Sequence, residues 1–164
     1  MSTAATLASE RSSTFSRSFR PLAAQAGIPI GTLRRHMKLF RRYSDADDQT
    51  MLVSRCSRPG RPRAGRYLML LTRQHLVVTR DSAVLHRPRV YLHLPVSKLE
   101  AVRWSADPDG ALVDLAISTP RGRERFWIRA LYAGQMWRLD AALGQVFRHS
   151  SAASRFAAFL SPAA

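Results

Sequence analysis

Residues 67–80 read YLMLLTRQHLVVTR, two apolar runs separated by a short polar break at Arg73 and Gln74. Each run is strand-sized and rich in Leu and Val, and neither continues long enough to form a helix. A short polar break between two such runs is typical of a β-hairpin with a tight turn. The stretch therefore predicts an antiparallel reversal of the chain at this point.

Similar runs precede and follow this hairpin, separated by turn signals such as RPGRPRAG, ADPDG and TPRG. The seven runs are TMLVSRCS (50–57), RYLMLLT (66–72), HLVVTR (75–80), AVLHRPRVYLHL (83–94), LEAVRWSA (99–106), ALVDLAIST (111–119) and RERFWIR (123–129). The spacing of three between Leu99 and Val102 departs from strand alternation and predicts a bulge. Pro88 predicts an edge or a bend in the fourth run.

The segment before these runs has helical periodicity. Its apolar residues recur at steps of three and four, at Phe15, Phe19, Leu22 and Ala26, and then at Leu33, Met37 and Phe40. Two short amphipathic helices are predicted. Gly27 suits the end of the first helix, Pro29 blocks its continuation, and Thr32 is the predicted cap of the second.

Helical spacing returns near the C-terminus, where Met136, Leu139 and Leu143 predict a helix over about 133–148. We therefore expect a leader at 1–14, without fixed structure, and a helical pair at 15–48. A strand-rich domain at 49–148 and a loosely held tail at 149–164 follow. The acidic, turn-prone stretch YSDADDQT (43–50) marks the change from helices to strands.

The hairpin YLMLLTRQHLVVTR resembles the signature hairpin of bacterial pleckstrin-homology-like (PH-like) and GRAM-type domains. The segment LPVSKLEAVRW is similar to a later part of that family, and the resemblance covers about residues 50–148. It implies an α+β, mainly β fold: a seven-stranded antiparallel barrel or sandwich, capped by the C-terminal helix. Because this scaffold carries lipid, peptide and protein recognition alike, the fold names no function.

Charge is the strongest feature of the composition. The 164 residues include 24 Arg and 2 Lys against 11 acidic residues, for a net charge of +15. Such an excess favours an acidic protein, an anionic membrane surface or nucleic acid as partner. A GC-rich genome would produce the same arginine excess without selection for binding. The single Cys56 excludes an internal disulfide and, in its apolar-flanked run, is predicted to be a small buried hydrophobe.

The loop RCSRPGRPRAGR is the first candidate site. It spaces Arg58, Arg61, Arg63 and Arg66 among Pro and Gly residues, which hold the backbone away from sheet geometry and leave the guanidinium groups projecting. In lipid-binding PH domains the corresponding loop ends in a basic-x-Arg pattern, which Arg61-Pro62-Arg63 resembles, although the usual leading Lys is replaced by Arg58. A merely solvated loop is the alternative.

The run RGRERFWIR is the second candidate. Alternation predicts that Phe126 and Ile128 face inward, whereas four other side chains face outward: Arg123, Arg125, Trp127 and Arg129. An outward Trp among arginines suits an acidic peptide or a stacked base. In the alternative, Trp127 packs beneath the front helices and the arginines fringe it.

The segment PLAAQAGIPIGTLRRHMKLF is the third candidate, because its spacing resembles a helix-turn-helix. Arg34, Arg35 and Lys38 would then face the major groove of DNA. Two alternatives remain: a helical pair packed on the barrel, and a helix lying in a membrane surface with Leu33 and Met37 downward.

Neither the scattered His residues nor the Asp residues form a metal-ligand or acid-base set, so the sequence predicts no metal, no cofactor, no small-molecule substrate and no enzyme activity. The prediction is a cytoplasmic binding module that recognises an acidic partner, a protein first and an anionic lipid headgroup second, at the membrane periphery in the latter case. The alternative is a DNA-binding regulator that uses residues 20–42.

Overall fold

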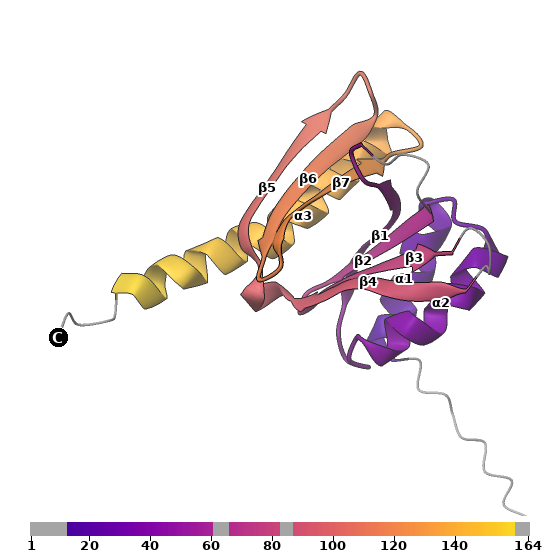
Figure 1. Ribbon diagram of the computed structural model, residues 1–164, viewed down its shortest axis with the longest axis horizontal. Coiled ribbons are helices and arrows are strands. Elements are labelled where there is room, and N and C mark those ends of the chain that lie inside the picture. The colour runs from indigo at the N-terminus through magenta and orange to yellow at the C-terminus, as the bar shows by residue number, and fades with distance from the viewer. Residues whose placement is uncertain (1–12, 61–65, 83–86, 160–164) are drawn as a thin grey trace, which may run out of the picture.

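The computed structural model describes residues 13–60, 66–82 and 87–159, with side chains up to residue 148 (Figure 1). The helices are α1 (Thr14–Gln25), α2 (Ile30–Arg42), the 3₁₀ turn η1 (Val96–Lys98) and α3 (Ala133–Phe159). The strands are β1 (Thr50–Ser57), β2 (Arg66–Thr72), β3 (His75–Asp81), β4 (Pro88–Pro95), β5 (Glu100–Asp107), β6 (Leu112–Thr119) and β7 (Gly122–Arg129). All seven predicted strands are confirmed, although residues 83–86 at the start of the predicted fourth strand lie outside the described residues.

The strands form one antiparallel sheet in the order β4-β3-β2-β1-β7-β6-β5. It has two halves, β1–β4 and β5–β7, which are joined through the pairs Cys56↔Ile128 and Ser57↔Trp127. The sheet is open, because β4 and β5 lie at its two ends. Followed by a C-terminal helix, this arrangement is the predicted PH-like, mainly β fold, preceded by two helices.

The β2–β3 hairpin is held by Thr72 at the end of β2. Its Oγ1 accepts hydrogen bonds from the backbone N–H groups of His75, at 2.8 Å, and Gln74, at 3.3 Å, and donates to the carbonyl of His75 at 3.1 Å. Thr72 thus pairs backbone groups of Gln74 and His75 that a tight reversal would leave unpaired, while the Arg73 N–H donates to the Gln49 carbonyl at 3.1 Å. The Leu-Thr step of the opening stretch is therefore the chemical basis of the turn.

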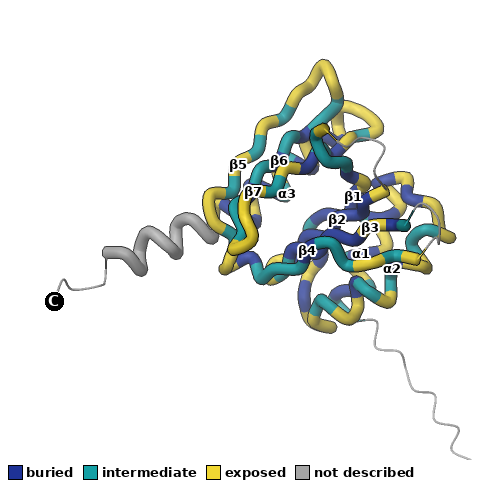
Figure 2. Tube along the Cα trace, viewed as in Figure 1, coloured by how far each residue is buried: buried dark blue, intermediate teal, exposed yellow. Residues whose placement is uncertain are grey.

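Strand β2 is buried on both faces: every residue from Tyr67 to Thr72 is buried (Figure 2). Met69 and Leu71 face the inner core, which lies between the two halves of the sheet and α3. Leu68 and Leu70 face the opposite way, toward α1 and α2. Because both faces are covered, β2 is continuously apolar instead of alternating.

The helical pair supplies the second, outer core. Phe15, Phe19 and Phe40 pack on Val53 and Val77 of the sheet, and Phe19 and Phe40 are fully buried. Figure 1 shows both helices against the β1–β4 half. The two predicted helices are confirmed, and their apolar stripe covers sheet surface that would otherwise be exposed to water.

One predicted helix end agrees with the structure and another does not. Gly27 has φ +59, so the first helix ends at a left-handed glycine as predicted. The predicted cap at Thr32 is wrong, because α2 begins earlier, at Ile30, directly after Pro29. Pro29 is therefore the residue that precedes the first turn of α2, and its side chain forms no capping hydrogen bond.

Helix α3 contacts the β5–β7 half and closes the inner core with Met136, Leu139 and Leu143, as predicted. The indole N–H of Trp104 on β5 donates to Asp140 Oδ1 at 2.8 Å, which fixes the helix against the sheet. The helix continues to Phe159, beyond the predicted end at 148. The predicted bulge in β5 is confirmed by a register shift between Glu100 and Arg103.

A buried polar cluster joins α2 to β3. His36 is fully buried, and its Nδ1 lies 2.7 Å from Thr79 Oγ1 while its Nε2 lies 3.3 Å from Asp81 Oδ1. Arg35 reaches the other oxygen of Asp81 at 3.3 Å. These contacts set the orientation of α2 on the sheet.

The variant Phe19→Ala tests the outer core. Removing a fully buried ring leaves a cavity between α1 and the sheet, so we expect the free energy of unfolding in urea to fall by about 3–5 kcal/mol. The exposed Ile30→Ala is the control, with an expected change of less than about 0.5 kcal/mol. Equal, small effects of the two variants would show that the helices do not pack as described.

The variant His36→Gln tests the buried cluster through pH. Burial lowers the pKa of His36, and the Asp81 carboxylate opposes this effect only in part. Below about pH 6.5 the unfolded chain therefore binds a proton that the folded chain excludes, and acidification favours unfolding. Urea denaturation at a series of pH values should show a smaller loss of stability on acidification in the variant than in the wild type. An identical loss of stability in the variant and the wild type would show that His36 does not cause the pH dependence.

Candidate binding surface

Arg58, the first arginine of the β1–β2 loop, is engaged inside the protein. Its guanidinium lies 2.9 Å from Glu124 Oε2 of β7 and 5.1 Å from the centre of the Tyr91 ring of β4. The Tyr91 hydroxyl donates to the same carboxylate at 3.0 Å, and burial together with Glu124 raises the pKa of Tyr91. Arg58, directly after β1, therefore contacts both β4 and β7 and already has an acidic partner within the protein.

The other arginines of the β1–β2 loop do not form a site that the structure describes. Arg61 and Arg63 lie outside the described residues, and Arg66 is exposed at the start of β2, opposite Asp81 in the strand register. Anion binding by this loop stays a prediction.

The alternation predicted for β7 is confirmed. Phe126 and Ile128 are fully buried, whereas Arg123, Arg125 and Arg129 are exposed. Trp127 is half-buried on the arginine side.

The alternative in which the front helices cover Trp127 is wrong. Those helices pack on the other half of the sheet, over β1, β2 and β3, where Leu68, Leu70 and Val77 receive them. Trp127 lies away from the front helices because its strand, β7, belongs to the other half of the sheet. Only the pairing of the strands determines this.

Side chains of β6 and β5 lie on the same surface of the sheet as the arginines of β7. On β6, Asp114 lies opposite Trp127 and Ala116 opposite Arg125, while Arg103 of β5 lies opposite Ala116 from the other side. We call the set Arg103, Arg123, Arg125, Trp127 and Arg129 the arginine face. Sequence reasoning missed Arg103, although the inward-facing Val102 and Trp104 on either side of it carried the signal.

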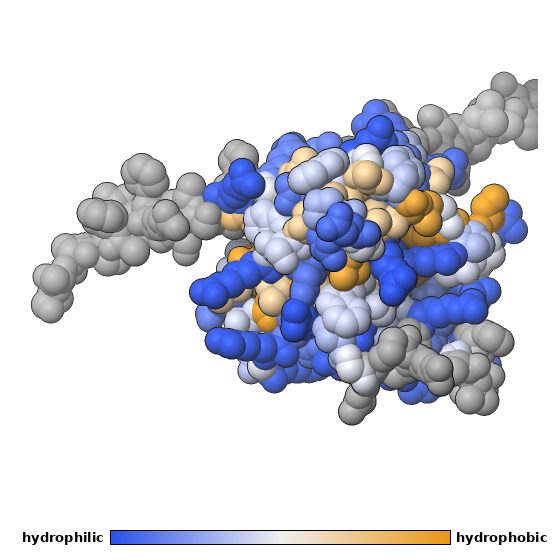
Figure 3. Space-filling view, turned by 90° about the horizontal axis from the view of Figure 1, so that it is seen from above, coloured by the Kyte–Doolittle hydropathy of each residue, from blue (hydrophilic) through white to orange (hydrophobic). Residues whose placement is uncertain are grey.

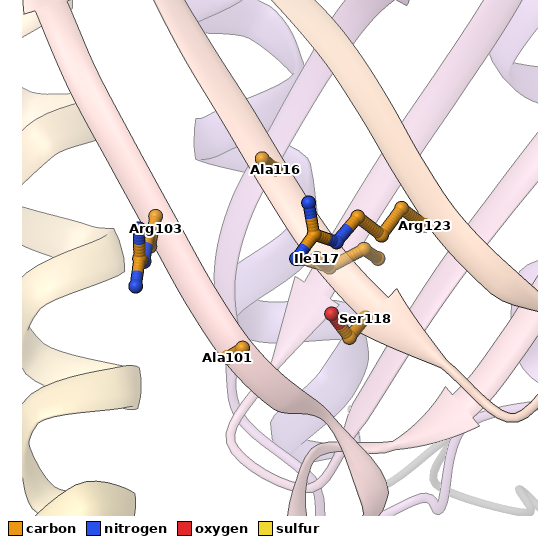
Figure 4. Close-up of a pocket in the computed structure, with 6 residues that line it drawn as sticks. All are labelled: Ala101, Arg103, Ala116, Ile117, Ser118 and Arg123. Atoms are coloured by element: carbon orange, nitrogen blue, oxygen red, sulfur yellow. The ribbon is translucent and has the colours of Figure 1, made fainter.

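The arginine face contains a shallow depression, which Figure 4 shows in close-up. Ala101, Arg103, Ala116, Ile117, Ser118 and Arg123 line it. Arg103 and Arg123 lie on opposite sides of Ala116 and Ser118, whose small side chains leave space between the guanidinium groups. The β5 bulge, where Ala101 has φ 44, shapes this end of the strand.

The arginines differ in how far they are neutralised. Arg125 forms an ion pair with Asp114, with 2.9 Å between Nε and Oδ1, and this carboxylate raises the pKa of the guanidinium. Within the described part of the chain, Arg103, Arg123 and Arg129 have no ion pair. The arginine face therefore presents uncompensated positive charge around an apolar and small-residue floor.

The residues of the helix-turn-helix hypothesis lie on α2. Arg34 and Lys38 are exposed, and Arg35 is held by Asp81. The opposite side of α2 is occupied by His36 and Phe40 against the sheet. The two helices pack on the sheet, in agreement with the predicted alternative of a packed helical pair, and DNA binding itself stays a prediction.

Reactive and metal-binding groups are sparse. Cys56 is buried in the inner core, where burial raises the pKa of its thiol, as expected for a packing residue. Across residues 13–60, 66–82 and 87–148, no three His, Cys, Asp or Glu side chains are placed to hold a metal ion. In the same ranges, none of the helices combines the length and the apolar character needed to cross a bilayer.

Comparison with known proteins gives a likeness of shape alone. No protein-family model matches the chain, and no curated protein matches it. Among solved structures, the chain is similar to the DH/PH domains of p115-RhoGEF, with 11% sequence identity and a TM-score of 0.47. The match covers 80% of this chain and 42% of that chain, so this chain spans less than half the length of the chain that it matches.

Two alanine variants compare an arginine that stabilises the fold with an arginine that has no ion pair in the described part of the chain. Arg58→Ala removes a partly buried ion pair and a ring contact, so we expect the free energy of unfolding to fall by about 1 kcal/mol. Arg123→Ala should change it by less than about 0.5 kcal/mol. Urea titrations of both variants beside the wild type give the comparison, and a larger loss for Arg123→Ala would reverse the two assignments.

Proposed function

We propose that this chain is a non-enzymatic PH-like binding module whose arginine face recognises an acidic protein segment. The observation that carries the proposal is the pair Arg103 and Arg123, two arginines without ion pairs across a floor of Ala116 and Ser118. Within the described residues no helix lies on the outer side of the β5–β7 half of the sheet, so an extended segment has access to it (Figure 1).

The chemistry of the face suits carboxylates. A guanidinium offers paired N–H donors to a carboxylate, and an exposed arginine gains most from a partner when no acidic neighbour already neutralises it. The small side chains of Ala116 and Ser118 let a peptide backbone approach the sheet between the arginines. Trp127 adds a half-exposed ring against which an apolar or cationic side chain can pack.

A second candidate is nucleic-acid binding through α2. The observation in its favour is the exposure of Arg34 and Lys38 on the solvent side of a helix whose orientation is fixed by His36 and Phe40. A rigidly held basic helix binds the phosphate backbone without needing a base-specific contact. This function uses a different surface, so the two candidates separate by mutation.

Charge reversal on the arginine face tests the proposal. Fluorescence anisotropy of a labelled poly-glutamate peptide should show an affinity at least about tenfold weaker for Arg103→Glu/Arg123→Glu than for the wild type. The control, Arg87→Glu/Arg89→Glu, makes the same change in net charge near the start of β4, at the opposite end of the sheet. It should change the affinity by no more than about twofold, because surface charges beyond a Debye length are screened.

Equal losses in the two variants would show that net charge, and not the arginine face, attracts the peptide. Labelled duplex DNA serves as the second probe, with Arg34→Glu/Lys38→Glu as the matched variant. Tight DNA binding that only this third variant abolishes would favour the nucleic-acid function over the proposed one.

A further inference from the structure

Arg125 differs from its neighbours on the arginine face in the direction of its side chain. The strand register places it directly opposite Ala116 of β6, which forms part of the floor of the depression. Arg103 lies opposite Ala116 from the other side, on β5. Arg103 and Arg123 line the depression, whereas Arg125 does not. An arginine that the register places beside the floor is therefore directed elsewhere.

Asp114 accounts for this direction. It lies on β6 two residues before Ala116, and so on the same face of the strand. Arg125 Nε donates to both oxygens of the Asp114 carboxylate, at 2.9 Å to Oδ1 and 3.1 Å to Oδ2, and Arg125 Nη2 donates to Oδ2 as well. Two nitrogens of the guanidinium thus bind one carboxylate, which is the contact that an acidic ligand would make with a free arginine.

The ion pair between Asp114 and Arg125 is accessible to solvent. The Arg125 side chain is 58% exposed and that of Asp114 is 22% exposed. Ion pairs at the surface contribute little to stability, because water and salt screen them. A partner carboxylate would offer Arg125 the same hydrogen bonds as Asp114 does, so the two carboxylates would compete for this guanidinium on nearly equal terms.

The acidic residue of β7, Glu124, does not take part in this competition. It faces the opposite side of the sheet, where its carboxylate accepts a hydrogen bond from the Tyr91 hydroxyl at 3.0 Å and pairs with Arg58 at 2.9 Å. Strands β6 and β7 contain no acidic residue besides Asp114 and Glu124. On these two strands, Asp114 is therefore the acidic side chain that faces the outer surface.

We infer that Asp114 is an internal competitor for the acidic ligands of the arginine face. It occupies Arg125 with a carboxylate of the protein itself, so the resting site consists of the arginines without ion pairs, Arg103 and Arg123 among them. A partner carboxylate reaches Arg125 only by displacing Asp114, and exchanging one carboxylate for another adds little affinity. The inference rests on the proposed function, and it names the residue that limits how many arginines contribute to binding.

The variant Asp114→Asn tests the inference. Asparagine keeps the shape of the side chain and removes its charge, so Arg125 becomes available to a ligand. Fluorescence anisotropy with the labelled poly-glutamate peptide should show an affinity about three- to fivefold higher than that of the wild type, the effect of about one exposed ion pair. An unchanged or lower affinity would overturn the inference.

A matched control separates the position of Asp114 from the change in net charge. Figure 3, which views the molecule from above, shows many hydrophilic side chains on the surface, so a general effect of charge on peptide binding has to be measured. Asp47→Asn makes the same change at an exposed position in the linker between α2 and β1. It should alter the affinity by less than about 1.5-fold, because distant surface charges are screened. Equal gains in the two variants would overturn the inference.

The variant Arg125→Gln shows whether Asp114 acts through Arg125. In this background Asp114→Asn removes only the repulsion between Asp114 and the peptide, so its gain in affinity should be at least about twofold smaller than in the wild-type background. Equal gains in the two backgrounds would show that Asp114 repels the peptide without competing for Arg125, and would overturn the inference.

Failure of this inference and failure of the proposed function give different results. If Arg103→Glu/Arg123→Glu weakens peptide binding but Asp114→Asn does not strengthen it, the arginine face binds acidic segments and Asp114 does not compete. If neither the wild type nor Asp114→Asn binds the peptide, both proposals are wrong. Binding by Asp114→Asn in the absence of wild-type binding would support the inference, because Asp114 would then inhibit the resting face.

Discussion

The structure depends on the burial of β2 and β3 on both of their faces. An antiparallel sheet commonly exposes one face to water, but here β2 has no exposed side chain from Tyr67 to Thr72, so both faces require a cover. The two halves of the sheet and α3 enclose the inner face, and the N-terminal helices cover the outer one. The helical pair is therefore part of the fold, and its aromatic residues Phe15, Phe19 and Phe40 are core residues as much as those of the strands.

The same constraint divides the surface into two kinds. Where helices cover the β1–β4 half, its outer side chains pack against those helices: Leu68, Leu70 and Val77 in the outer core, and Thr79 and Asp81 through His36. Among the described residues no helix covers the β5–β7 half, and its outer side chains include arginines, small residues, Asp114 and Trp127. The helical cover also creates a junction with the β7–α3 linker, where Leu131 packs on the turn at Gly27. The proposed contact surfaces are thus consequences of which parts of the sheet the helices reach.

Most of the fold was predictable because it depends on the periodic spacing of apolar residues within short stretches of the chain. Alternation in β6 and β7, the helical spacing of α1, α2 and α3, and the Thr72 turn each depend on residues close together in the chain. The site was less predictable because it depends on pairing between distant segments. The sequence predicts Arg58 to be a free loop arginine, because its partners Glu124 and Tyr91 are more than 30 residues away in the chain. Arg103 joins the arginine face only through the β5–β6 register, and the contact between Leu131 and Gly27 has no local signature at all.

Native-state amide hydrogen exchange of the full chain tests the two-sided core most directly. If α1 and α2 are integral to the fold, their central amides open only with the sheet, and their opening free energies equal those of β2 and β3. Protection in β2 and β3 together with rapid exchange throughout α1 and α2 would contradict this account, because the outer face of the sheet would then be stable without its helical cover.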